Sequence, residues 1–121
     1  MINSEVKLTL EYNDGRIAIL SSSQLAKSDR QGIISGTEGF IIVENVNNPQ
    51  SYSIYDFDYK LVKTVKCPPQ ITGYEYEVIA SMEAIENHQT ECPDCTHAQS
   101  IKLLEIMDEA RAQMGIKYPS E

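Results

Sequence analysis

Apolar and polar residues alternate along the start of the chain, which is the pattern of a half-buried β-strand. Residues 6–12 show this period of two, and Asn13-Asp14-Gly15 follows directly. Asn, Asp and Gly tolerate the positive φ angles that tight hairpin turns need. The pattern therefore predicts a β-hairpin whose return strand covers residues 16–21.

Short apolar runs separated by turn residues continue as far as residue 65. They predict further strands near residues 31–35, 40–43, 52–54 and 61–65, with turns at Gly36-Thr37-Glu38-Gly39, at Asn47-Asn48-Pro49 and at 56–59. Connections this short join only antiparallel neighbours. We therefore expect a mainly antiparallel sheet of about six strands.

The last third of the chain has a helical pattern instead. Thr72-Gly73-Tyr74-Glu75 and Thr96-His97-Ala98-Gln99 both fit the capping box, in which a side chain at each end of the motif satisfies a free backbone N–H. Two helices should follow these motifs. For the second, we expect an end near Met114, because Gly115 suits a left-handed cap and Pro119 prevents continuation.

Strands first and helices last predict an α+β fold, in which two C-terminal helices pack on one face of the sheet. We expect residues 1–121 to form a single domain. Its other sheet face poses a problem, since Phe40 and Ile42 point one way while Ile41 and Val43 point the other. A sheet that is apolar on both faces predicts a partner over the open face, and a second copy of the chain would supply it. The alternative is that these positions lie at strand ends or under a loop.

Charge and composition exclude several classes of partner. The chain has a formal net charge of −8, and its ten Lys and Arg residues are scattered. Nucleic-acid affinity depends on clustered basic residues, so no nucleic-acid partner is expected. We find no apolar run long enough to span a membrane and no secretion signal at the N-terminus. A cytoplasmic protein without a membrane partner is the expectation.

Cys92-Pro93-Asp94-Cys95, followed by His97, is the sharpest local motif. Two cysteines at this spacing can share a zinc ion, and His97 could be a further ligand, although a closed site needs four. The same pair could act as a redox dithiol, although redox sites of the thioredoxin type follow a strand, and here the motif joins two helices. The ordinary alternative is a helix connection with two unremarkable cysteines.

Several segments, taken in order, resemble the C-terminal third of the Gfo/Idh/MocA oxidoreductases, in the branch of dihydrodiol and sugar dehydrogenases. The segments are Ile34-Ser35-Gly36-Thr37-Glu38-Gly39, Ile71 to Val78, Glu91-Cys92-Pro93, His97-Ala98, and Ile106 to Arg111 with Gly115 to Pro119. The resemblance covers roughly residues 5–119. Its order and spacing are more specific than any single motif.

The resemblance implies that this chain is the substrate-binding and dimerisation domain of a longer NAD(P)-dependent enzyme acting on a sugar- or diol-like hydroxyl. The Rossmann domain that binds NAD or NADP in that family is absent from the chain, and so are its glycine fingerprint and catalytic Glu-Lys-Pro motif. We therefore carry over no catalytic and no cofactor-binding residue. The isolated chain is expected to bind no cofactor and to show no turnover.

Pro69, Gln70, Thr72 and Tyr74 lie in the stretch that the resemblance places near a polyol substrate. Two other functions stay open: a stand-alone interaction or dimerisation module, and a small zinc or thiol protein that uses Cys92, Cys95 and His97. The substrate itself, the choice between NAD and NADP, and whether Met1 is native are not determined by the sequence.

Overall fold

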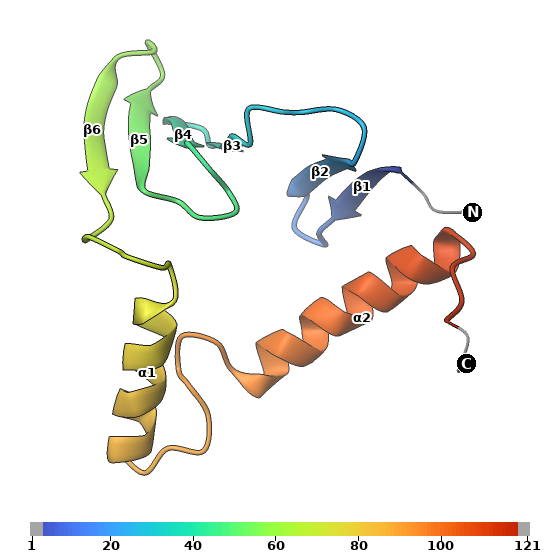
Figure 1. The fold of residues 1–121 in the computed structure, drawn as a ribbon. Coiled ribbons are helices and arrows are strands. Elements are labelled where there is room, and N and C mark those ends of the chain that lie inside the picture. Colours follow the sequence, from blue (N-terminus) through green and yellow to red (C-terminus); the bar gives the residue numbers. More distant parts are fainter. Residues whose placement is uncertain (1–3, 119–121) are drawn as a thin grey trace. The chain divides into compact units, whose positions relative to one another are not determined.

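The computed structural model describes residues 4–118, which form six strands and two helices (Figure 1). The residues divide into two compact units, 1–73 with the strands and 74–121 with the helices. The elements are β1 (Glu5–Glu11), β2 (Ile17–Ser23), β3 (Gly32–Ser35), β4 (Gly39–Val43), β5 (Ser51–Asp56), β6 (Leu61–Lys66), α1 (Glu75–Glu86) and α2 (His97–Gln113).

The predicted hairpin is confirmed as an antiparallel pair of β1 and β2. Leu8 pairs with Leu20, and the alternating residues Val6, Leu8 and Leu10 are half-buried. In its turn, the Arg16 guanidinium donates to the Asp14 carboxylate at 2.8 Å. This hydrogen bond favours the ionised form and lowers the pKa of Asp14.

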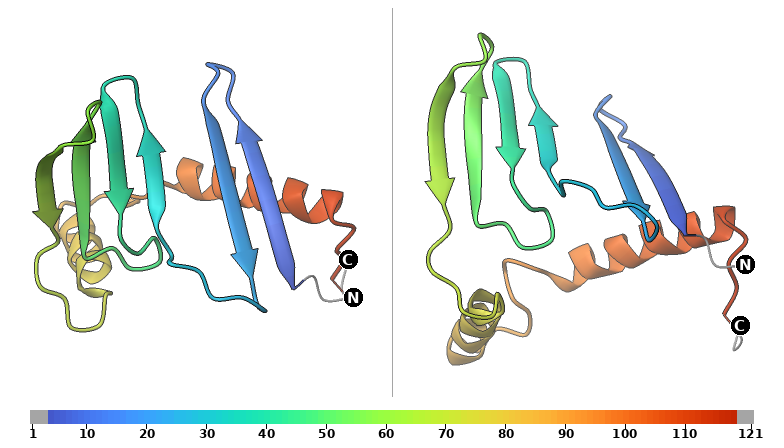
Figure 2. Two further views of the ribbon diagram at one scale, coloured as in Figure 1. Left: turned by 90° about the horizontal axis from the view of Figure 1, so that it is seen from above. Right: turned by 45° about the horizontal axis from the view of Figure 1, so that its top comes forward.

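The remaining strands form a second antiparallel sheet in the order β3-β4-β5-β6 (Figure 2). Strand β4 lies inside it and pairs Ile41 with Ile34 on one side and with Ile54 on the other. The pairing of β5 with β6 shifts at Ile54/Tyr55, where a bulge lets Tyr55 pair with Leu61. The four strands follow one another in sequence, so every connection is a hairpin.

Strand register places apolar side chains on both faces of this sheet, as predicted. We name the faces after two neighbours on β4. The Ile41 face carries Ile34, Ile41, Val43, Tyr52, Ile54, Lys63 and Val65, and the Phe40 face carries Ile33, Phe40, Ile42, Ser53, Tyr55, Leu61, Thr64 and Lys66. On the Phe40 face, the rings of Phe40 and Tyr55 stack with their centroids 4.9 Å apart.

Gly39 fixes how tightly β4 joins β5. A Cβ atom at this position would overlap the Tyr55 carbonyl oxygen, and it would lie 3.0 Å from Asp56 Cα. Both neighbours are backbone atoms that cannot rotate away. Gly39 is therefore required for the close approach of β4 to β5. Its carbonyl oxygen also accepts a hydrogen bond from the backbone N–H of Gly36 at 2.8 Å, which closes the turn.

The first helix differs from its prediction at the N-terminus. α1 begins at Glu75 with Tyr74 at the N-cap, and Tyr74 makes no side-chain capping hydrogen bond. The predicted helix start, with Thr72 at the N-cap, is wrong by two residues, because Gly73 would then be the first helical residue and it has a φ of +91°. Glycine adopts that left-handed angle readily, but it lies outside the right-handed helix.

The second helix follows its prediction closely. Thr96 and Gln99 form the full capping box at its N-terminus. At the C-terminus the backbone N–H of Ile116 donates to Arg111 O at 3.1 Å and that of Gly115 donates to Ala112 O at 3.0 Å. With Gly115 at φ +66°, this is the predicted Schellman motif. The predicted stop at Pro119 lies outside the described residues.

The described residues enclose very little apolar core. Among residues 4–118, Ala84 is the single buried apolar residue, and no large side chain is fully buried. No helix within that range is long and apolar enough to cross a membrane.

The α+β class, the six antiparallel strands and the two helices are confirmed. One difference concerns the sheet, because the strands divide into a pair and a set of four. After β2 the chain forms a turn, in which the backbone N–H groups of Leu25 and Ala26 donate to Ser23 Oγ. This polar segment separates the pair of strands from the set of four. Packing of the helices on a sheet face and a single domain remain predictions.

The close approach at Gly39 predicts a large difference between two glycine substitutions in one turn. Gly39→Ala should lower the free energy of unfolding by more than about 3 kcal/mol, because the strand pairing must open. Gly36→Ala is the matched control, since its Cβ would meet Gly39 O at an ordinary 3.5 Å. We expect it to cost less than about 1 kcal/mol. Urea unfolding followed by circular dichroism measures both, and equal losses would contradict the assignment.

Candidate functional site

The loop between β6 and α1 is held against the loop between β4 and β5. The backbone N–H of Cys67 donates to Gln50 O at 2.8 Å. Its thiol lies 3.2 Å from Pro49 O. These two contacts continue the pairing of β5 with β6 beyond the last strand residues. They bring residues 67–73 beside residues 48–50 at one end of the four-stranded sheet.

Gly73 lies close to side chains from both of these loops. A Cβ atom there would lie 3.1 Å from Asn48 Nδ2 and 3.6 Å from Gln70 Oε1. The Gly73 backbone therefore lies against side chains from both loops. Its φ of +91° is a second reason for glycine at this position.

The side chains of Asn48 and Gln70 lie beside Gly73, and Gln50 contacts Asn48; we call these three amide residues the amide cluster. Gln50 Nε2 donates to Asn48 Oδ1 at 3.1 Å. Gln70 Oε1 is buried and has no hydrogen-bond partner among the described residues. A buried acceptor without a partner costs about 1–3 kcal/mol, and native proteins satisfy nearly all of them.

The predicted substrate-adjacent residues divide between the two units. Pro69, Gln70 and Thr72 belong to the loop that carries the amide cluster. Tyr74 is the first residue of the helical unit, where it is the N-cap of α1 and is 65% exposed. The structure thus brings Gln70 together with Asn48 and Gln50, which the sequence analysis treated only as part of a turn.

A shallow concavity of about 440 Å³ lies on the Ile41 face, beside the Gly36–Gly39 turn. Its floor is formed by side chains from all four strands, namely Ile34, Ile41, Ile54 and Val62. Thr37, Glu38 and Asp56 also line this concavity, so it offers polar groups beside its aliphatic side chains. The amide cluster is the second candidate for recognising a polar molecule.

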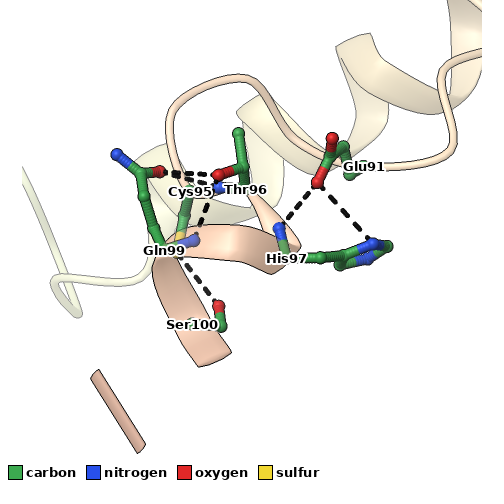
Figure 3. A network of polar contacts seen from close by, with 6 residues as sticks. All are labelled: Glu91, Cys95, Thr96, His97, Gln99 and Ser100. Carbon is green, nitrogen blue, oxygen red and sulfur yellow. Dashed lines mark hydrogen bonds and ion pairs between the residues drawn. The ribbon is translucent and has the colours of Figure 1, made fainter. Parts of the chain in front are cut away.

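Cys92 and Cys95 lie in the connection between the helices, and His97 begins α2; Figure 3 shows Cys95 and His97. Cys92 and Cys95 are both free thiols, and their backbones pair as an isolated antiparallel bridge. His97 is the first residue of α2, and its backbone N–H donates to Glu91 Oε2 at 2.6 Å. The residues that the structure describes contain no group of three or more His, Cys, Asp or Glu side chains arranged to hold a metal ion.

Comparison with known proteins gives the same relatives as the sequence motifs. The chain is 29% identical over 120 residues to a scyllo-inositol 2-dehydrogenase (NADP(+)) of Bacillus subtilis, a match that covers 99% of this chain. It is 30% identical over 123 residues to trans-1,2-dihydrobenzene-1,2-diol dehydrogenases of Xenopus tropicalis and Xenopus laevis. The chain is a homologue of the C-terminal domain of Gfo/Idh/MocA-type oxidoreductases. The resemblance predicted from the motifs is confirmed.

The chain spans little more than a third of the length of these Gfo/Idh/MocA-type relatives, 36% for the inositol dehydrogenase and 37% for the diol dehydrogenases. No protein-family profile matches the chain, and no solved structure matches it significantly.

The capping box that anchors the Cys92–Cys95 turn should contribute measurably to the helical unit. Thr96→Ala removes the hydroxyl that accepts from the Gln99 N–H, and we expect a loss of about 1 kcal/mol in the free energy of unfolding. Thr90→Ala is the control, because Thr90 is an exposed residue outside the cap. Thermal unfolding of both variants measures the effect, and a Thr96→Ala variant as stable as Thr90→Ala would show that the cap contributes nothing.

Proposed function

We propose that this chain is the substrate-binding and dimerisation domain of an NAD(P)-dependent oxidoreductase acting on a sugar- or diol-like hydroxyl. The observation that carries the proposal is the match over nearly the whole chain to enzymes named for an inositol and a diol. Both compounds present neighbouring hydroxyl groups, so the recognition problem is the same in each. Three free cysteines suit the reducing cytoplasm, where we place the protein.

The amide cluster has the chemistry to recognise such a substrate. A hydroxyl group both donates and accepts hydrogen bonds, and a side-chain amide does the same through its oxygen and nitrogen. Gln70 Oε1 is a buried acceptor without a partner among the described residues. We propose that it accepts a hydrogen bond from a substrate hydroxyl, while Asn48 and Gln50 hold their loop in place through their own hydrogen bond.

The residues of this chain do not fit the nicotinamide dinucleotide. Dinucleotide phosphates bind at helix N-termini that have free N–H groups and a positive field. Here α1 carries Glu75 and Glu77 in its first turn. At α2, Thr96 and Glu91 already accept N–H groups. We therefore propose that the nicotinamide cofactor and the hydride-transfer residues belong to a separate nucleotide-binding domain, as in the predicted longer enzyme.

For the dimer, we propose that two copies meet through the Phe40 face. Protein interfaces are rich in aromatic residues and poor in charge, whereas cores are mainly aliphatic. The Phe40 face fits the first description. The rings of Phe40 and Tyr55 stack, and the centroid of the Tyr59 ring lies 5.6 Å from that of Phe40. The hydroxyl groups of Ser53 and Thr64 are hydrogen-bonded at 3.0 Å. The Ile41 face is more aliphatic, with Ile34, Ile41, Val43 and Ile54.

Neighbouring isoleucines on β3 offer a matched test of this dimer. Ile33 on the Phe40 face is 63% exposed and Ile34 on the Ile41 face is 62% exposed. Ile33→Lys should raise the dimer dissociation constant at least about tenfold, because a charge would be buried between two apolar surfaces. Ile34→Lys should lower stability but leave the dissociation constant within about threefold.

Light scattering over a concentration series measures the dissociation constants, and circular dichroism checks that each variant folds. A larger effect of Ile34→Lys would assign the dimer to the other face. A wild-type chain that stays monomeric throughout would contradict dimerisation by this domain.

If Gln70 recognises the substrate, replacing it should weaken substrate binding without lowering the stability of the chain. Gln70→Met should leave the free energy of unfolding unchanged or raise it by up to about 1 kcal/mol, because it removes the unpaired oxygen. It should also weaken the binding of scyllo-inositol at least about fivefold. Gln89→Met, at an exposed position in the helix connection, is the matched control.

Two-dimensional NMR of the side-chain amides follows the titration with scyllo-inositol. We expect the Asn48, Gln50 and Gln70 signals to shift in the wild type. If saturating inositol shifts none of them while the dimer persists, the chain is better described as an interaction module.

A further inference from the structure

The Cys92–Cys95 turn has the geometry of a disulfide site, and the proposed dehydrogenase function does not use it. The two residues pair as an antiparallel bridge, and the backbone N–H of Cys95 donates to Cys92 O at 3.2 Å. Residues paired directly across antiparallel chains have Cα atoms about 4.5–5.5 Å apart. A disulfide needs Cα atoms about 4.4–6.8 Å apart. The backbone therefore holds both cysteines within bonding reach.

Two anchors outside the cysteines hold this turn in place. Glu91, just before Cys92, accepts the backbone N–H of His97 at 2.6 Å and so closes a wider ring around the same turn. Thr96, just after Cys95, is fixed by its reciprocal hydrogen bonds with Gln99 at 2.8 and 3.3 Å (Figure 3). Pro93 adds a fixed φ inside the turn. Such constraints reduce the conformational freedom that two thiols must lose when they join.

The two thiols differ in exposure, which gives them different roles in an exchange reaction. Cys95 is exposed and Cys92 is half-buried. The Cys95 sulfur also lies 3.8 Å from Ser100 Oγ, a hydroxyl that can donate to it. The exposed sulfur can reach a molecule from solvent, while the half-buried sulfur is positioned to attack Cys95.

We propose that Cys92 and Cys95 form a reversible disulfide by exchange with a low-molecular-weight disulfide of the glutathione type. The Cys95 thiolate attacks one sulfur of glutathione disulfide, which breaks that S–S bond and releases one glutathione. The Cys92 thiolate then attacks Cys95 Sγ in the mixed disulfide and releases the second glutathione. Two cysteine thiols are oxidised, one glutathione disulfide is reduced to two thiols, and the two cysteine protons pass to the released thiolates through solvent.

Graded glutathione buffers test this on the full 121-residue chain. After acid quenching and alkylation, intact mass counts the free thiols, and peptide mapping locates any link. We expect a Cys92–Cys95 link whose formation constant is at least about tenfold larger under native conditions than in guanidinium, because the folded turn raises the effective concentration of one thiol at the other.

Variants separate the turn from the other thiol. Cys67→Ser should leave the constant unchanged, and Cys92→Ser or Cys95→Ser should each abolish the link. Pro93→Gly should move the native constant toward the value in guanidinium. Equal constants in the two conditions, a link through Cys67, or stable glutathione adducts without ring closure would each overturn the proposal.

Discussion

The structure depends on one constraint, which is that a four-stranded sheet must shield apolar side chains on both of its faces. Strand β4 sets this requirement, because Phe40 and Ile42 alternate with Ile41 and Val43 in the middle of the sheet. Hydrogen bonds between the strands satisfy their backbone N–H and C=O groups, but they do not shield the apolar side chains on either face. A helical layer over one face and a second copy over the other would satisfy both.

The same pairing positions the polar end of the sheet. Because β5 and β6 stay in register up to Ser51 and Lys66, the loops that follow them are brought together, and the Cys67 N–H extends the ladder by one more bond. Gly73 then allows the second loop to lie against Asn48. An apolar sheet thus ends in a group of amides, with the buried Gln70 oxygen among them. Rigid strands below and polar loops above are a common arrangement for recognising small molecules.

Sequence patterns predicted the elements well because each is specified locally. The alternation around Leu8, the Thr96–Gln99 cap and the Gly115 stop all depend on residues close together in the chain, and all are present. The start of α1 was misplaced because Thr72 and Glu75 fit a capping box equally well on paper. Gly73 has a left-handed φ of +91° and so does not begin the helix, and its backbone lies against Asn48, which is far away in sequence. The amide cluster was missed for the same reason. In the sequence, Asn48 and Gln50 look like ordinary turn residues, and only the pairing of β5 with β6 brings their loop beside Gln70.

The outer strands of the sheet have a consequence for how the protein avoids self-assembly of the wrong kind. An unpaired strand offers a template on which another chain can add and begin a fibre. Strand β3 offers only four residues. On β6, Lys63 and Lys66 place charged side chains on the outer strand, and the register shift opposite Ile54 and Tyr55 interrupts its regular pairing. The short β3 and the irregular β6 therefore leave the four-stranded sheet with outer strands that are poor templates for another chain.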